Sequence, residues 1–137
     1  MIQGEITWFE IPVSDLDRAM KFYSNVLSIK MEKTIFIDKE YAIFNKDKGS
    51  LKGVLALKEN HQPCHGIVLF FYTVDLSESM KAVEVSGGKI IISKTLLKKK
   101  ASGGAMTISN NLIDGNIGYY AEIIDSEGNQ ICLYSNS

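Results

Sequence analysis

The sequence predicts an α+β fold made of two tandem βαβββ modules, which form a curved mixed sheet as a pair of half-barrels. Two observations carry this prediction. Strand-like and helix-like segments run in the order β-α-β-β-β, and the same order restarts at residue 67. In addition, Asp15-Leu16 and Met20-Lys21 of the first helical segment recur 60 residues later as Asp75-Leu76 and Met80-Lys81. An internal match of this kind indicates duplication.

The first module opens with a predicted strand at 6–13, ITWFEIPV, which is rich in aromatic and β-branched residues. Pro12 near its end is typical of an edge or terminal position. An amphipathic helix follows in 14–28, where Ser14 or Asp15 can cap the first turn and apolar residues recur at helical spacing. Three further strands are expected at 31–37, 41–45 and 54–58.

The second module repeats this order after a polar linker at about 60–66. It contains a strand at 67–74, a helix that a glycine pair ends, a strand at 89–93, and strands at 119–124 and 130–134 around the turn DSEGN. The whole chain, 1–137, is then one domain with modules at about 4–59 and 67–136.

The segment between the predicted strands at 89–93 and 119–124 is crowded with Lys, Gly, Ser and Asn. We expect a strand at 105–109 within it and a long loop over 98–116. A lid that folds over a binding cavity and an idle insertion are both open interpretations of this loop.

The charge and hydropathy of the chain exclude several partners. The net charge is −1 and the only strongly basic run is Lys98-Lys99-Lys100, which argues against a nucleic-acid partner. No apolar run approaches the roughly 20 residues of a membrane span. Since the N-terminus also lacks the profile of a signal peptide, we expect a cytoplasmic protein in which Cys64 and Cys132 remain thiols.

Four motifs resemble the vicinal oxygen chelate superfamily, and above all its small glyoxalase-like proteins. They are WFEIPV at the start, SDLDRAMKFYSNVL after it, YYA before the last turn, and DSEGNQICLYS at the end. That superfamily includes glyoxalase I, the fosfomycin-resistance proteins, the extradiol dioxygenases and the bleomycin-binding proteins. The resemblance covers essentially the whole chain and implies the βαβββ half-barrel fold. It is a poor guide to function, because one fold hosts several chemistries.

In the metal-dependent members of the superfamily, His, Gln or Glu side chains from the first and last strands of each module hold one divalent ion. The resemblance places these ligands on Trp8, Leu69 and Cys132, and the fourth within 54–57, which contains only Val, Leu and Ala. Trp and Leu cannot bind a hard cation and a lone Cys would not hold one. We therefore expect no metal and no cofactor. A zinc cluster could be drawn in the linker, but its three ligands make a poor site: His61, Cys64 and His65.

Strand alternation predicts which side chains share the face of the lost ligands. This inner face is expected to be mostly apolar and aromatic with a few polar groups, which is the composition of a small-molecule site. The predicted ligand-binding residues are Trp8, Glu10, Leu69, Phe71, Tyr120, Glu122, Cys132 and Tyr134.

Glu10 is the candidate catalytic residue on this face. It could act as a general base, as a hook for a cationic or hydroxylated ligand, or only as a structural hydrogen-bond partner. Trp8 could be a stacking platform for a flat ligand or a plug that fills the emptied metal site. Cys132 is expected to be an inert buried thiol.

Two functions remain open from the sequence. The first is a metal-free protein that binds an aromatic or amphipathic metabolite or toxin, as the resemblance to the bleomycin-binding proteins implies. The second is a glyoxalase-like lyase or isomerase with Glu10 as its base. Because small members of the superfamily commonly pair, we also expect a symmetric homodimer.

Overall fold

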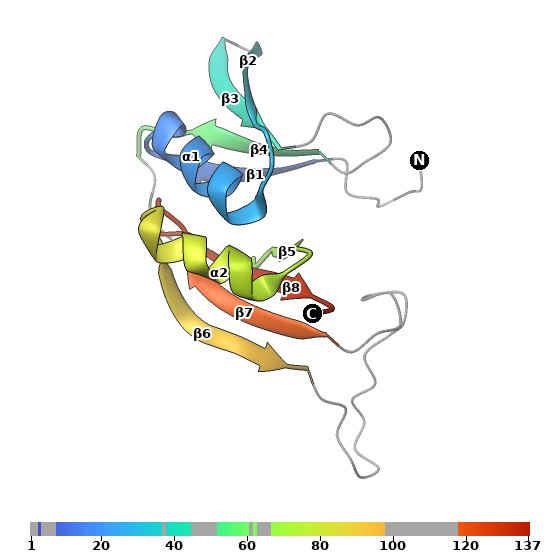
Figure 1. Cartoon of the computed structure of the whole chain (residues 1–137). Coiled ribbons are helices and arrows are strands. Elements are labelled where there is room, and N and C mark those ends of the chain that lie inside the picture. Colours follow the sequence, from blue (N-terminus) through green and yellow to red (C-terminus); the bar gives the residue numbers. More distant parts are fainter. Residues whose placement is uncertain are drawn as a thin grey trace.

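The computed structural model describes Gln3, residues 8–36, 38–44, 52–60, Gln62, 67–97 and 118–137. Module 1 contains β1 (Trp8–Val13), α1 (Leu16–Leu27), β2 (Glu32–Phe36), β3 (Lys39–Ile43) and β4 (Lys52–Leu57). Module 2 contains β5 (Phe70–Tyr72), α2 (Leu76–Val85), β6 (Lys89–Leu96), β7 (Tyr119–Ile124) and β8 (Gln130–Ser135). The predicted α+β fold with two βαβββ modules is confirmed (Figure 1).

Each module forms its own four-stranded sheet, with strand orders β1-β4-β3-β2 and β5-β8-β7-β6. In both sheets the first strand of the module pairs in parallel with the last, and the other pairings are antiparallel. The position of β1 at a sheet edge agrees with Pro12, which has no backbone N–H to donate to a second neighbour.

The two helices begin at equivalent positions, 60 residues apart. The side chain of Asp15 caps α1 by accepting a hydrogen bond from the Arg18 backbone N–H at 2.9 Å. Asp75 caps α2 in the same way, with the Glu78 backbone N–H as the donor at 3.2 Å. The helix ends differ, because Ser28 after α1 is left-handed with φ of 53° whereas Ser86 after α2 has φ of −93°.

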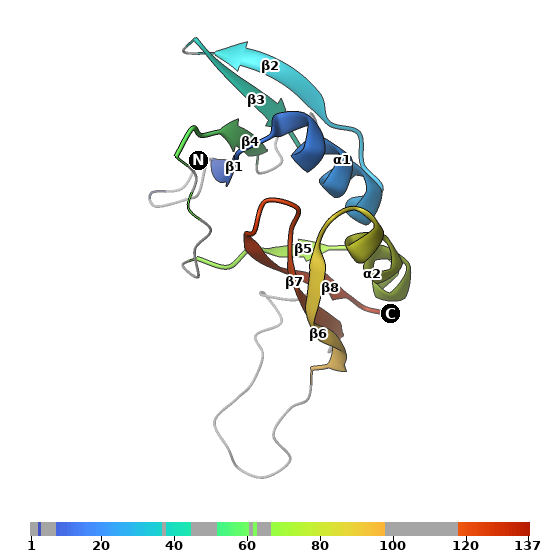
Figure 2. The same cartoon turned by 90° about the vertical axis from the view of Figure 1, so that its left-hand side faces the viewer.

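Both helices cover the same side of the molecule, and the two modules share one core. Figure 2 shows α1 and α2 together on the right, with β1, β4 and β5 to their left. Aromatic rings join the modules inside this core. The Phe71 ring stacks on the Phe44 ring with 5.3 Å between the ring centroids, and it makes an edge-to-face contact with the Phe9 ring at a centroid distance of 5.9 Å. The sheet faces that point away from the helices are called here the open faces.

The strand boundaries differ from the prediction in module 2. Strand β5 spans only Phe70–Tyr72, and β6 extends to Leu96. Because β6 pairs directly with β7, which pairs with β8, these three described strands complete the βαβββ order of module 2. That segment and the proposed lid over 98–116 lie outside the described residues.

The turn between β7 and β8 ties the two modules together through a buried carboxylate. The Glu127 side chain accepts hydrogen bonds from the backbone N–H groups of Ser14 and Asp15, both at 3.0 Å, at the start of α1. Its other oxygen accepts from Arg18 Nε at 2.7 Å, and Arg18 Nη2 donates to the first oxygen at 2.9 Å. Burial alone raises the pKa of Glu127, but these hydrogen bonds outweigh it and lower the pKa from 4.5 to about 2.

A second buried carboxylate completes this contact. Asp125 accepts a hydrogen bond of 2.6 Å from the Tyr23 hydroxyl of α1, and Asn129 Nδ2 donates to the Pro12 carbonyl of β1 at 2.9 Å. Burial and the charge of Asp125 raise the pKa of Tyr23 well above 10. We call this set the intermodule cluster: Ser14, Asp15, Arg18, Tyr23, Asp125, Glu127 and Asn129.

Within the described residues, neither helix is long and apolar enough to cross a membrane.

Candidate functional site

The open face of module 1 follows the predicted alternation of β1. Ile11 and Val13 point into the core, whereas Trp8, Glu10 and Pro12 alternate with them and lie on the open face. The Trp8 side chain is 57% exposed, so Trp8 does not plug a cavity in this chain. Of the two interpretations of Trp8, only a platform for stacking agrees with this exposure.

Glu10 is compensated by a neighbouring cation. Its carboxylate lies 3.5 Å from the Lys58 ammonium, and the Glu10 side chain is 36% exposed. Beside them, Val54, Ala56 and Tyr41 form a small buried cluster on the same face. On this face the Glu10 carboxylate therefore has access to water and a partner charge.

The open face of module 2 carries two rows of side chains that run across the strands. Tyr120 of β7 pairs in register with Tyr134 of β8, which pairs with Tyr72 of β5. The next row consists of Glu122, Cys132 and Phe70. The predicted placement of Tyr120, Glu122, Cys132 and Tyr134 on one face is confirmed, since Ala121, Ile123, Ile131 and Leu133 between them are buried in the core.

The predicted placement of Leu69 and Phe71 on this face is wrong. Both side chains pack against the core, and Phe70 and Tyr72 take the open face with 60% and 57% of their surface exposed. The prediction matched Leu69 to Trp8, an offset of 61, and so shifted the strand by one residue, which moves every side chain to the other face. The offset of 60 between the caps Asp15 and Asp75 would have given the observed register.

Polar contacts on the open face of module 2 centre on Glu122. Its Oε1 accepts a hydrogen bond from Gln130 Nε2, which belongs to the adjacent strand β8. Cys132 is a buried free thiol, and burial followed by the charge of Glu122 raises the pKa of Cys132 to about 11. A thiol held in its neutral form is a weak nucleophile, as expected for Cys132.

The register also refines the four positions to which the resemblance assigns metal ligands. Glu10 pairs with Val54 in module 1 as Phe70 pairs with Cys132 in module 2, so the fourth position falls on Val54. With the corrected register, the second-module counterpart of Trp8 is Val68 rather than Leu69. Trp, two Val and one Cys do not form a donor set for a divalent ion.

No group of three or more His, Cys, Asp or Glu side chains with metal-binding geometry occurs in the part of the chain that the structure describes. The linker residues His61, Cys64 and His65 lie outside that part.

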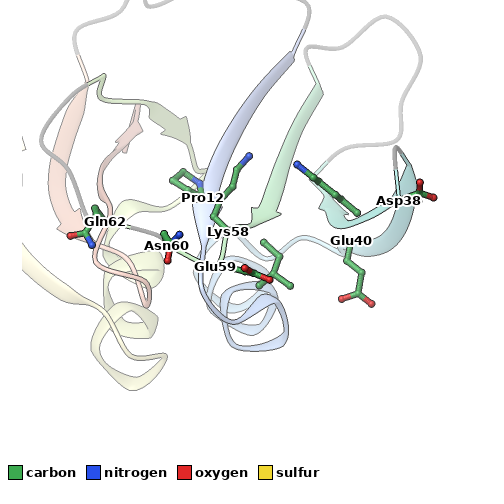
Figure 3. Close-up of a pocket in the computed structure, with 9 residues that line it drawn as sticks. Pro12, Asp38, Glu40, Lys58, Glu59, Asn60 and Gln62 are labelled. Carbon is green, nitrogen blue, oxygen red and sulfur yellow. The ribbon is translucent and has the colours of Figure 1, made fainter.

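A separate hollow of about 760 Å³ lies on module 1, near the ends of β1 and β4 (Figure 3). Its wall is mostly charged or amide-bearing, and none of the predicted ligand-binding residues lines it: Pro12, Asp38, Lys39, Glu40, Leu57, Lys58, Glu59, Asn60 and Gln62. Lys58, the partner of Glu10, links this hollow to the open face of module 1.

Comparisons with known proteins agree with the fold. Residues 5–45 match the family model described as bleomycin resistance protein-like N-terminal. The whole chain is similar to a hypothetical protein from S. aureus, with 19% identity, 98% of each chain covered and a TM-score of 0.60. It is also similar to a glyoxalase/bleomycin resistance protein from Albidiferax ferrireducens, with 16% identity, coverage of 96% and 98%, and a TM-score of 0.58.

Glyoxalase I from Zea mays gives a TM-score of 0.66 at 21% identity, where 95% of this chain covers 45% of that one. A search of curated proteins finds no match. The resemblance to the vicinal oxygen chelate superfamily is thus confirmed at the level of the fold, with a sequence match over the first helix and its flanking strands.

Proposed function

We propose that this protein binds an aromatic or amphipathic small molecule on its open faces, without the help of a divalent metal ion. The observation that carries the proposal is the exposure of Trp8, Phe70 and Tyr72 on faces where relatives would place metal ligands. Large aromatic side chains dominate ligand contacts, and burying them under a ligand is favourable by about 25 cal/mol for each Å² removed from water.

Two sequence-based features belong to this proposal. A homodimer would cover part of the exposed aromatic surface and would shape a cavity from two open faces. A cytoplasmic location rests on the amino-acid sequence alone.

The alternative function, a glyoxalase-like lyase or isomerase with Glu10 as its base, gains no support from the described contacts. The Glu10 carboxylate is exposed and lies beside the Lys58 ammonium. Glu122, the carboxylate on the open face of module 2, accepts a hydrogen bond from the side-chain amide of Gln130.

A nuclear magnetic resonance titration with benzyl alcohol, a neutral aromatic and amphipathic probe, tests the proposal. Amide signals of β1, β5, β7 and β8 should shift on binding, and the fluorescence of Trp8, the only tryptophan, should change. Trp8→Leu and Tyr72→Leu should each weaken binding by about fivefold, since a lost aromatic contact costs about 1 kcal/mol.

Val85→Ala is the matched control, because Val85 is an exposed apolar residue of α2 and does not lie on an open face. This variant should bind benzyl alcohol as the unchanged protein does. Absence of binding, or binding that Val85→Ala weakens as much as Tyr72→Leu does, would overturn the proposed function.

A further inference from the structure

Glu10 and Glu122, which lie on the open faces of the two modules, differ in how their charge is compensated. Glu10 of module 1 has the Lys58 ammonium at 3.5 Å. Glu122 of module 2 has the neutral amide of Gln130 as its hydrogen-bond donor and forms no ion pair with any described residue. An uncompensated carboxylate on a partly buried apolar face attracts a cation more strongly than a compensated one does.

Among the described residues, the basic side chains of the neighbouring strand β6 form no ion pair with Glu122. The Lys94 ammonium lies 4.6 Å over the Tyr119 ring and 3.4 Å from Ser77 of α2, so it points to the helix side of the sheet. Lys89 pairs in register with Ile124, at the far end of β7 from Tyr120, and makes no ion pair with Glu122. The other open-face residues of β5, β7 and β8 are uncharged: Phe70, Tyr72, Tyr120, Ile124, Gln130, Cys132 and Tyr134.

A row of aromatic rings lies on one side of this charge. The row of Tyr120, Tyr134 and Tyr72 crosses three strands, two residues along from the row that contains Glu122. Two residues of a β-strand span about 6.6 Å, so a small organic cation can touch both rows at once. The centroids of the Tyr72 and Tyr134 rings lie 6.5 Å apart, and the angle between the ring planes is 46°. The faces of aromatic rings carry partial negative charge, which attracts cations.

The negative potential extends to the centre of the face. The charge of Glu122 contributes to raising the pKa of Cys132, which sits between Glu122 and Phe70 in the same row. The face is therefore electrostatically suited to a cation as well as apolar.

We propose that the open face of module 2 binds an organic cation, namely a protonated amine or quaternary ammonium group attached to an apolar body. The cationic group lies beside Glu122, and the apolar body lies against Tyr120 and the exposed Tyr72, which flank the buried Tyr134. This inference rests on the proposed function, which requires binding on an open face, and adds the charge of the ligand and the residues that select it.

Benzylamine, benzyl alcohol and benzoate test the inference, because they share a ring and differ in charge. Titration of the full chain at neutral pH should show that benzylamine binds at least tenfold more tightly than benzyl alcohol, which corresponds to about 1.4 kcal/mol. Benzoate should bind more weakly than benzyl alcohol. Added salt should reduce the preference for benzylamine.

Glu122→Gln should abolish this preference, so that benzylamine and benzyl alcohol bind within about twofold of each other, whereas the matched variant Glu10→Gln should retain it. Tyr72 provides a second test on an exposed side chain. Tyr72→Leu should weaken benzylamine and benzyl alcohol alike by about fivefold, because the apolar body that contacts Tyr72 is common to both probes, and Tyr72→Phe should restore both affinities because the ring remains.

Equal affinity for benzylamine and benzyl alcohol would overturn this inference and leave the proposed function standing. A preference that disappears in Glu10→Gln rather than in Glu122→Gln, or one that disappears in Tyr72→Leu, would also overturn it. If none of the three probes binds, the proposed function fails first.

Discussion

Glu127 shows at the scale of one residue how a turn can hold two modules together. Its carboxylate is fully buried and accepts hydrogen bonds from Arg18 and from the first residues of α1. The sequence identified DSEGN as a turn, but it could not reveal these contacts, because they join residues more than a hundred positions apart.

The first prediction concerns the pH dependence of stability. Because the pKa of Glu127 is lowered from 4.5 to about 2 in the folded protein, the ionised group stabilises the fold at neutral pH by about 3 kcal/mol. This contribution is fully present above pH 4.5 and is lost as the pH falls towards 2. Urea unfolding at a series of pH values measures it.

Glu127→Gln should lower the free energy of unfolding at neutral pH by about 3 kcal/mol and flatten its decline between pH 4.5 and 2. Glu78→Gln is the control, since Glu78 occupies the position in α2 equivalent to Arg18 and forms an exposed ion pair with Lys81. Exposed pairs contribute little, so Glu78→Gln should change stability by less than about 1 kcal/mol. Equal effects of the two variants would contradict the account of Glu127.

The second prediction concerns Cys132. Because burial and Glu122 raise the pKa of Cys132 to about 11, the thiol should react slowly with iodoacetamide at pH 8 in the folded protein and rapidly after unfolding. A Cys64→Ser background isolates the signal of Cys132. Alkylation of the folded protein at the rate of a free cysteine would contradict this prediction.

At the scale of elements, the helices were easier to predict than the strand faces. Apolar spacing and the capping residues Asp15 and Asp75 are local signals, and both helices begin where these signals place them. The face of β5 depends on register, where an error of one residue exchanges Leu69 and Phe71 for Phe70 and Tyr72. The compensation of Glu10 by Lys58 depends on a contact between strands that no single segment encodes.

The third prediction concerns the end of α1. Ser28 adopts a left-handed conformation with φ of 53°, which strains residues that carry a Cβ atom. Ser28→Gly should therefore raise the free energy of unfolding by about 0.5 to 1 kcal/mol. Ser86→Gly is the control at the end of α2, where φ is −93° and the Ser86 hydroxyl accepts a hydrogen bond from Asn25; it should lower stability. Thermal unfolding of both variants and of the unchanged protein measures these effects. A Ser28→Gly variant no more stable than the unchanged protein would contradict the prediction.

At the scale of the whole molecule, the fold leaves two open faces on the side away from the helices (Figure 2). Exposed aromatic residues on these faces and on the edge strand β5 favour association. We predict a symmetric homodimer, measured by light scattering at tens of micromolar protein. A monomer mass at that concentration would contradict the prediction.

The central claim, that the chain binds a small molecule without a metal ion, is tested most directly by one titration. Benzylamine is added to protein stripped with a chelator and, in parallel, to protein supplied with zinc, nickel or manganese. The account predicts the same dissociation constant and the same shifted amides on β5, β7 and β8 in every case, because Trp8, Val54, Val68 and Cys132 do not form a metal site. Binding that appears only after a metal is added would contradict it.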